Sequence, residues 1–285
     1  MTSRSSTKEV LVIVGSGGMG LSIARRVGAG RVILLADISR SCLDAASEAL
    51  SDDGHHVLTQ EVDVTSRTSV AAVADAAAST GRVIAVVHTA GLSPQQASAD
   101  AVMAVDLLGV ALSIEEFGRV IEPGGAGVVI ASMAGHLQPA LDPEVERQLA
   151  ATPTDELLGL EACSSITDSG LAYAFAKRAN QIRVAAAAAT WGERGARINS
   201  ISPGVISTAM GRAELSGESG GFMQAMVDNA GLRRIGTPDD IAAATEFLLG
   251  PAAAFITGTD LSVDGGVTAA IRTGTIDLAQ ALAQR

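Results

Sequence analysis

The chain has 285 residues and a formal net charge of −11; 47% of its residues are apolar and 2% are aromatic. This composition excludes a mostly disordered chain, and the negative charge argues against binding to nucleic acid or to anionic membranes. Its two cysteines, Cys42 and Cys163, give no disulfide framework, and no apolar run is long enough to cross a bilayer, so we expect a cytoplasmic protein.

Apolar runs rich in β-branched residues alternate with alanine-rich segments along the chain. The apolar runs predict buried strands at residues 10–14, 32–36, 57–62, 83–87, 127–131, 197–201 and 260–263. The segments between them predict helices at residues 21–27, 43–50, 70–78, 99–121, 171–191 and 238–249. Repeated strand–helix units predict one α/β domain over residues 1–285, a doubly wound parallel sheet of about seven strands with helices on both faces.

Three stretches interrupt this alternation. Residues 136–169 are polar, acidic and proline-containing, which predicts an insertion with its own short helices. Residues 207–235 contain five glycines and predict a mobile loop with a short helix, and residues 267–285 form a tail beyond the last strand.

A glycine-rich turn follows the first predicted strand. Gly15, Gly17 and Gly20 fit the pattern G-x-G-x-x-G and precede a helix. Glycines at this spacing let the backbone approach a pyrophosphate, which then lies on the amides of the helix N-terminus. By itself the pattern also fits a turn that packs a strand on a helix. In this context it favours a dinucleotide-binding Rossmann fold.

An acidic residue, Asp37, ends the second predicted strand 22 positions after Gly15. This is the spacing expected for a carboxylate that accepts hydrogen bonds from the adenosine ribose, and its charge would repel a 2′-phosphate. We therefore expect NAD(H) rather than NADP(H), although Arg40 lies nearby and would weaken that preference. The alternative role for Asp37 is that of a helix N-cap.

The single tyrosine of the chain, Tyr173, precedes Lys177 by four positions. On a helix these two side chains share a face, and a nearby ammonium is expected to lower the pKa of the phenol. Such a phenol suits proton exchange with an alcohol or carbonyl oxygen. Ser132 ends another predicted strand, at the sheet edge where such folds bind ligands.

The ordered set of these motifs resembles the short-chain dehydrogenase/reductase family. The motifs are residues 15–20, Asp37, Asp63-Val64, Thr89-Ala90-Gly91, Ser132, Tyr173 with Lys177, Pro203-Gly204 with Thr208, and Asp264-Gly265-Gly266. The resemblance covers about residues 9–266, nearly the whole chain. The combination is specific, although no single piece of it is.

The resemblance implies roles for individual residues. Ser132 would bind the substrate oxygen, Tyr173 would exchange the proton, and Lys177 would bind the nicotinamide ribose and lower the pKa of Tyr173. Hydride would pass between NAD(H) and the substrate carbon. The residues expected to bind the cofactor are Gly15, Ser16, Gly17, Gly18, Met19, Gly20, Asp37, Ile38, Asp63, Val64, Ala90, Gly91, Tyr173, Lys177, Pro203, Gly204, Ile206 and Thr208.

The sequence departs from the family pattern at several positions. The glycine turn is one residue short and Val14 replaces a threonine, while His88 and Thr89 replace two asparagines. Asp106 stands where the catalytic asparagine is expected. It either pairs with Lys177, which would partly cancel the effect of that ammonium on Tyr173, or it turns to solvent or caps the backbone locally.

The 41 positions from Ser132 to Tyr173 exceed the usual gap of the family. This insertion and the sequence around Tyr173 resemble the bacterial 3α-hydroxysteroid dehydrogenase/carbonyl reductase branch. The resemblance implies a homodimer rather than the common homotetramer.

We therefore expect an NAD(H)-dependent oxidoreductase that interconverts a secondary alcohol and a ketone or aldehyde, steroid-like or otherwise apolar. The changes at Asp106 and His88 motivate an alternative, a catalytically silent NAD-binding sensor or assembly module. The four histidines show no metal-ligand spacing, so no metal is expected.

Overall fold

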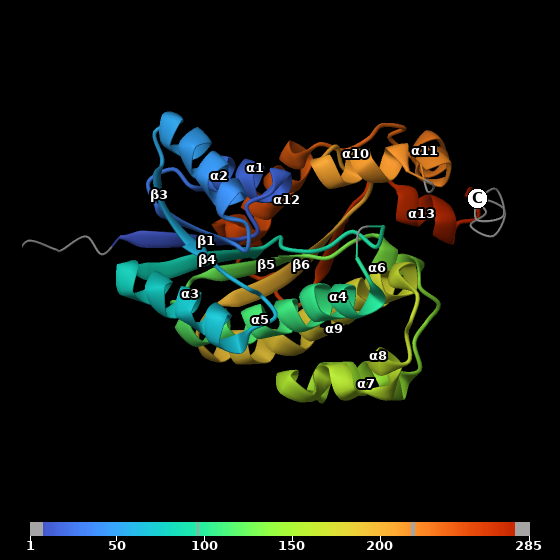
Figure 1. Cartoon of the computed structure of the whole chain (residues 1–285), viewed down its shortest axis with the longest axis horizontal. Helices are drawn as coiled ribbons and strands as arrows, with labels where there is room; N and C mark the ends of the chain where they lie inside the picture. The colour runs from blue at the N-terminus through green and yellow to red at the C-terminus, as the bar shows by residue number, and fades with distance from the viewer. Residues whose placement is uncertain (1–7, 96, 218–219, 277–285) are drawn as a thin grey trace, which may run out of the picture.

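The computed structural model describes residues 8–95, 97–217 and 220–276 (Figure 1). Its centre is one seven-stranded parallel sheet with the strand order β3-β2-β1-β4-β5-β6-β7. The strands are β1 Glu9–Val14, β2 Val32–Asp37, β3 His56–Glu61, β4 Arg82–His88, β5 Ala126–Ile130, β6 Arg197–Pro203 and β7 Asp260–Val263. The predicted fold class is confirmed, because this is the doubly wound sheet that the alternating pattern indicated.

The central strands are apolar without alternation because helices cover both faces of the sheet. In β1, Leu11 and Ile13 face one helical layer, while Val10, Val12 and Val14 face the other. The first layer contains α1 Gly18–Val27, α2 Arg40–Asp52 and α12 Pro238–Leu249. The second contains α3 Arg67–Thr80, α5 Gly109–Val120 and α9 Ser169–Glu193. Figure 1 shows the two layers above and below the sheet.

The predicted helix over residues 99–121 is not a uniform α-helix. It comprises α4 Ala99–Val102, a π-helical segment Met103–Leu108 and α5. A π-helical turn widens the backbone spiral, and such turns are frequent at functional sites. The irregular segment contains Asp106, so the departure from the prediction falls on a candidate site residue.

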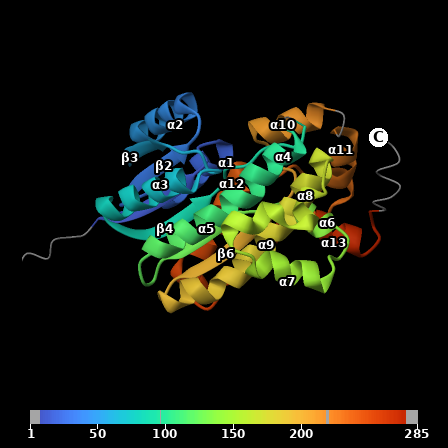
Figure 2. The same ribbon diagram turned by 60° about the horizontal axis from the view of Figure 1, so that its bottom comes forward.

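The insertion covers the outer side of α9. Its helices are α6 Ala134–Leu137, α7 Pro143–Ala151, a 3₁₀ turn Thr154–Gly159 and α8 Glu161–Ser164. Leu149, Leu157 and Cys163 of the insertion form one buried cluster with Phe175 and Ala179 of α9. Figure 2 shows α7 and α8 lying along this side.

The described residues of the glycine-rich segment contain more helix than the sequence predicted. They form two helices, α10 Ala209–Ser216 and α11 Gly220–Asn229, where one short helix was expected. A short 3₁₀ turn Pro251–Ala253 precedes β7, and α13 Val267–Arg272 follows it. The part of the predicted tail beyond residue 276 lies outside the described residues. Figure 1 shows α10, α11 and α13 gathered at one end of the sheet.

Within the described part of the chain, no helix combines the length and apolar character needed to span a membrane.

Candidate active site

A cavity of about 490 Å³ opens where β1, β2 and β4 end. Strand order changes direction between β1 and β4, and open α/β sheets bind ligands at such a switch point. The sequence-predicted cofactor residues in its lining are Gly15, Gly17, Gly18, Met19, Gly20, Asp37, Ile38, Asp63, Val64, Ala90, Gly91 and Thr208. The structure therefore brings together residues from four βα connections and the start of α10.

The glycine-rich turn leaves no room for side chains at two of its positions. Gly15 has φ +100°, and a Cβ there would lie 2.5 Å from the Ala90 nitrogen. A Cβ on Gly20 would lie 2.0 Å from the Gly15 oxygen. Gly17 is the N-cap of α1 without a side-chain cap, and its Cβ position meets nothing within 4 Å. Open space in front of uncapped amides fits the pyrophosphate of a dinucleotide.

Asp37 lies at the rim of this cavity, where hydrogen bonds from Ser16 and Ser39 fix its carboxylate. One carboxylate oxygen accepts from the Ser16 amide at 2.7 Å and from the Ser16 hydroxyl at 2.9 Å. The other accepts from the Ser39 amide at 2.9 Å. The N-cap of α2 is Ser39, so the alternative role of Asp37 as a helix cap is wrong. Arg40 is engaged by Asp44 at 3.1 Å, which balances its charge.

Tyr173 and Lys177 lie one turn apart on α9, as their spacing predicted. The Lys177 Nζ is 5.2 Å from the centre of the Tyr173 ring. Ser132 follows β5, and its hydroxyl lies near enough to Tyr173 to lower the pKa of the phenol. The three predicted catalytic side chains therefore meet at the carboxyl end of the sheet.

Asp106 is fully buried and pairs with Lys177. Its Oδ2 lies 3.1 Å from the Lys177 Nζ, and its Oδ1 accepts from the Leu92 amide at 2.7 Å. The Asn180 side chain, one turn beyond Lys177 on α9, donates to the Asp106 backbone oxygen at 2.9 Å. Of the two alternatives for Asp106, the ion pair is therefore present and the solvent-facing aspartate is not.

The net pKa shift of Tyr173 differs from the expected one. Burial raises the pKa of this phenol, the Lys177 charge and the Ser132 hydrogen bond lower it, and the charges of Asp106 and Glu214 raise it. The net direction is upward, so the expectation of a lowered pKa is wrong. The sequence showed the ammonium beside the phenol and named Asp106 as a charge that opposes it, but it showed neither the burial nor Glu214.

Asp106 and Lys177 form a coupled pair. Burial raises the pKa of the Asp106 carboxyl, and the Lys177 ammonium and the Leu92 amide oppose that rise. Burial lowers the pKa of Lys177, but the charges of Asp106 and Tyr173 outweigh it, so the net shift is upward. Lys177 therefore keeps its proton, and its positive charge is shared between a carboxylate and a phenol.

The two positions that replace the expected asparagines have structural partners. Thr89 donates its hydroxyl to the Gly15 oxygen at 2.7 Å and so ties β4 to the glycine turn. His88 is buried, with Nδ1 2.9 Å from the Ser113 hydroxyl. Burial and the Lys177 charge lower the pKa of His88 to about 3, so this ring is neutral at physiological pH.

Sequence reasoning missed three residues around this site. Asn180 holds the backbone of Asp106, and Ser93 donates to Glu214 of α10 at 2.7 Å. Glu214 lies in the glycine-rich segment, where no motif marked it. The four-residue spacing of Met210 and Glu214 on one helix was the available signal, but the segment was predicted mainly as a loop.

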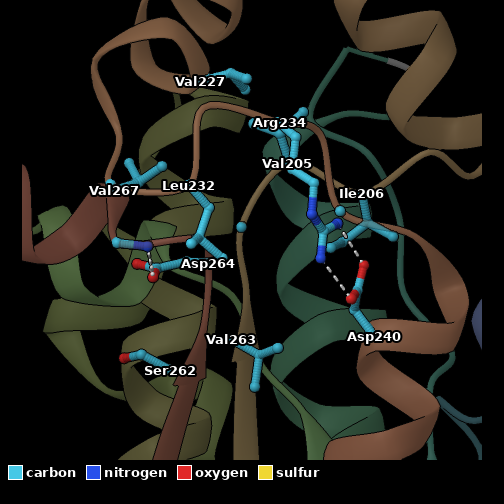
Figure 3. A pocket seen from close by; sticks show the side chains of 15 residues that line it. Val205, Ile206, Val227, Leu232, Arg234, Asp240, Ser262, Val263, Asp264 and Val267 are labelled. Atoms are coloured by element: carbon cyan, nitrogen blue, oxygen red, sulfur yellow. Dashed lines mark hydrogen bonds and ion pairs between the residues drawn. The ribbon is translucent and has the colours of Figure 1, made fainter.

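A second cavity of about 570 Å³ lies at the ends of β6 and β7. Figure 3 shows Arg234 and Asp240 facing each other beside it, joined by two contacts of 2.8 Å. Two predicted cofactor residues, Gly204 and Ile206, line this second cavity, and Pro203 is buried at the end of β6. Thr208 lines the first cavity and caps α10. The backbone after β6 therefore separates the two cavities.

Family models match most of the chain. The model described as short chain dehydrogenase matches residues 8–142, and the model described as enoyl-(acyl carrier protein) reductase matches residues 159–268. The gap between the two matches falls within the insertion.

Individual relatives extend over nearly the full length. The chain is 40% identical over 265 residues to the short-chain dehydrogenase/reductase bsc3 of Alternaria brassicicola, covering 92% of this chain and 97% of that relative. It is 33% identical to the 3-alpha-hydroxysteroid dehydrogenase/carbonyl reductase of Comamonas testosteroni, covering 66% of this chain and 73% of the relative. The crystal structure of levodione reductase is 25% identical and superposes with a TM-score of 0.74, covering 93% of this chain and 99% of that one.

Proposed function

Because the chain belongs to the short-chain dehydrogenase/reductase family, an oxidoreductase family acting on alcohols and carbonyl compounds, we propose that it is an NAD(H)-dependent enzyme. It interconverts a neutral, largely apolar secondary alcohol and the corresponding ketone or aldehyde, and a steroid-like substrate is one candidate. The observation that carries this proposal is the meeting of Ser132, Tyr173 and Lys177 at the carboxyl end of the sheet, where Lys177 lies against Gly91, a lining residue of the cavity built by the glycine turn.

The cofactor preference rests on Asp37. Its carboxylate is fixed by two serines at the rim of the cavity, where a 2′-phosphate would meet a negative charge. Gly15, Gly17 and Gly20 would hold the pyrophosphate at the N-terminus of α1, and Asp63 and Val64 would border the adenine. When bound, NAD(H) supplies or accepts the hydride.

The residues of the chain handle the proton and the substrate oxygen. Ser132 binds that oxygen and orients it toward Tyr173. In the reductive direction the Tyr173 phenol gives its proton to the oxygen, and in the oxidative direction the phenolate takes the proton back. Lys177 stabilises the phenolate through its positive charge. The upward pKa shift of Tyr173 keeps the phenol protonated at neutral pH, which favours the reductive direction there.

Replacement of Tyr173 by phenylalanine tests the proposal directly. Tyr173→Phe removes the proton donor and retains the ring, so turnover falls by about 10²- to 10⁴-fold. Binding of NADH, measured by calorimetry, remains close to that of the wild type. Ser132→Ala, which removes a hydrogen bond to the substrate oxygen, lowers turnover in the same assay. Undiminished turnover in Tyr173→Phe would contradict the assigned chemistry.

A catalytically silent NAD-binding sensor or assembly module is the second candidate. The pairing of Lys177 with Asp106 favours it, because part of the ammonium charge is already neutralised. A broad panel of alcohols and ketones with NAD⁺ and NADH separates the two functions. Turnover of any panel member supports the enzyme, and cofactor binding without any turnover supports the sensor.

The expected assembly as a homodimer or homotetramer is part of the same proposal. The insertion covers the outer side of α9 with residues of the same chain, which supports a dimer formed elsewhere on the surface. Light scattering on the purified protein measures the number of subunits. The cytoplasmic location remains a prediction from cysteine content and composition.

A further inference from the structure

Glu214 of α10 contacts the loop that follows β4. The Ser93 hydroxyl donates to the Glu214 Oε1 at 2.7 Å, and the same hydroxyl accepts from the Gln95 amide at 3.3 Å. Ser93 is 1% exposed, so its hydroxyl is fixed from both sides. One oxygen of a half-buried carboxylate therefore has a defined position against this loop.

The loop is itself tied to the elements that carry the catalytic side chains. The Leu92 amide donates to Asp106, the partner of Lys177, at 2.7 Å. The Ser169 hydroxyl, at the start of α9, donates to the Pro94 oxygen at 2.7 Å. Tyr173 follows four positions later on the same helix. Hence Ser93 and Glu214 have a set position relative to the phenol.

Glu214 lies on the face of α10 that also carries Met210, a lining residue of the cofactor cavity. Met210 and Leu92 line that cavity, and each is a near neighbour of one partner in the Ser93–Glu214 hydrogen bond. Met210 and Glu214 are four positions apart on α10, so they share a helix face. The charge of Glu214 also reaches Tyr173, since it raises the pKa of that phenol.

Within the described part of the chain, the second oxygen of Glu214 has no hydrogen-bond donor. Among the described residues, Ser93 is its hydrogen-bond partner and no arginine, lysine or histidine forms an ion pair with it. Arg212, on the same helix, donates to the Ser207 oxygen instead. A carboxylate with no cationic partner among the described residues attracts hydrogen-bond donors and repels anions.

We propose that Glu214 is a specificity-determining residue that favours substrates with a hydroxyl or ammonium donor close to the reacting carbon and disfavours substrates with a carboxylate there. The inference rests on the proposed function, because it takes Tyr173 as the site of proton exchange. It changes the largely apolar substrate of that proposal to a carbonyl compound, or its alcohol, that carries a second hydrogen-bond donor near the reacting carbon.

The test compares three methyl ketones of similar size in the reduction by NADH: 2-pentanone, 4-hydroxy-2-butanone and acetoacetate. In the wild type, kcat/KM is highest for 4-hydroxy-2-butanone, lower for 2-pentanone and lowest for acetoacetate. Glu214→Gln keeps the shape and removes the charge, so kcat/KM for acetoacetate relative to 2-pentanone rises about tenfold, the ratio that 1.4 kcal/mol represents. The advantage of the hydroxyketone over 2-pentanone shrinks in the same variant.

Two further variants separate recognition from a structural effect. Ser93→Ala keeps the Glu214 carboxylate and removes the hydrogen bond to its Oε1. The ratios of kcat/KM for acetoacetate and for 4-hydroxy-2-butanone to that for 2-pentanone should therefore shift in the same direction as in Glu214→Gln, by a smaller factor. Asp228→Asn, an exposed carboxylate on the neighbouring α11, leaves both ratios at the wild-type values. A structural defect alone lowers all three kcat/KM values together and leaves their ratios unchanged.

The outcomes distinguish this inference from the proposed function. Turnover of the ketones with unchanged ratios in Glu214→Gln overturns the role of Glu214 and leaves the enzyme assignment intact. No turnover of any ketone by the wild type, in this set or in the broader panel, overturns the proposed function and this inference with it.

Discussion

The carboxylate of Asp106 lies 3.1 Å from the ammonium of Lys177, and both side chains are almost completely buried. A buried pair of this kind costs desolvation on both sides, and removing one partner leaves an uncompensated charge. The Lys177 Nζ lies over the Tyr173 ring, 5.2 Å from its centre, and Gly91 covers the pair, since a Cβ there would lie 3.2 Å from the Asp106 Oδ2 and 3.3 Å from the Lys177 Nζ. The charge that acts on Tyr173 is therefore set by two residues together.

Asp106→Asn should move the pH dependence of the reaction to lower pH. The Asp106 charge raises the pKa of Tyr173, so its removal lowers that pKa. Oxidation requires the phenolate and rises as pH passes the pKa, while reduction requires the phenol and falls there. Both limbs, measured as kcat/KM against pH, are expected to shift toward acid.

Glu116→Gln is a matched control for that experiment. Glu116 is also a buried carboxylate, but it forms ion pairs with Arg67 of α3 and Arg119 of α5. The Glu116→Gln variant should therefore have the same dependence of kcat/KM on pH as the wild type. An identical profile for Asp106→Asn and the wild type would show that the Asp106 charge does not act on Tyr173.

Asn180→Ala should destabilise the fold around the π-helical segment. The Asn180 amide donates to the Asp106 backbone oxygen, and both groups are buried. Loss of a buried donor leaves that carbonyl unsatisfied, at a cost of about 1–3 kcal/mol in the free energy of unfolding. Urea denaturation measures this loss, and turnover should fall as well because Asp106 loses its support.

Asn229→Ala controls for the removal of an asparagine from a helix. Asn229 donates to the Ala225 oxygen of its own helix, at an exposed position. Its replacement should change the free energy of unfolding by less than about 0.5 kcal/mol. Equal effects of the two substitutions would mean that Asn180 is an ordinary helix residue.

Sequence reasoning succeeded where the signals are local and failed where they are not. The glycine turn, Asp37 and the Tyr173–Lys177 pair depend on strand ends and on i, i+4 spacing, which a short window shows. The contacts of Asn180 with Asp106 and of Ser93 with Glu214 span 74 and 121 positions, and neither Asn180 nor Glu214 carries a motif. The pKa of Tyr173 depends also on burial and on the charge of Glu214, which the sequence did not show, so the predicted direction of its shift was wrong.

Asp37→Asn should relax the cofactor preference. The amide retains the size of the carboxylate, and its one oxygen can still accept from the Ser16 amide, while the contact with the Ser39 amide is lost. Without the negative charge, a 2′-phosphate is no longer repelled. The ratio of kcat/KM for NADH to that for NADPH should fall at least about tenfold, which corresponds to 1.4 kcal/mol.

Asp52→Asn is the control for the loss of one negative charge. Asp52 is an exposed residue at the end of α2, and it does not line the cofactor cavity. The NADH to NADPH ratio of the Asp52→Asn variant should equal that of the wild type. If Asp37→Asn also keeps the ratio, or if the wild type prefers NADPH, the assignment of NAD(H) is wrong.

His88 should make the protein sensitive to acid. Burial and the Lys177 charge lower the pKa of His88 from its ordinary value of 6.5 to about 3. Below about pH 6.5 the unfolded chain therefore binds a proton that the folded chain refuses, and stability is lost as the pH falls toward 3. This contribution is fully present above pH 6.5. In the acid range it weakens the fold by up to about 1.4 kcal/mol per pH unit.

His88→Asn removes the titrating ring and keeps a side chain able to hydrogen-bond with Ser113. Urea denaturation of the wild type and the variant at about pH 7 and about pH 5 measures the difference. The wild type should lose more free energy of unfolding than His88→Asn between these two conditions, while the exposed His56→Asn should follow the wild type. The carboxylates of the chain titrate in all three proteins and cancel in the comparison. Parallel losses in the wild type and His88→Asn would show that the His88 ring accepts a proton in the folded protein, against its burial beside Lys177.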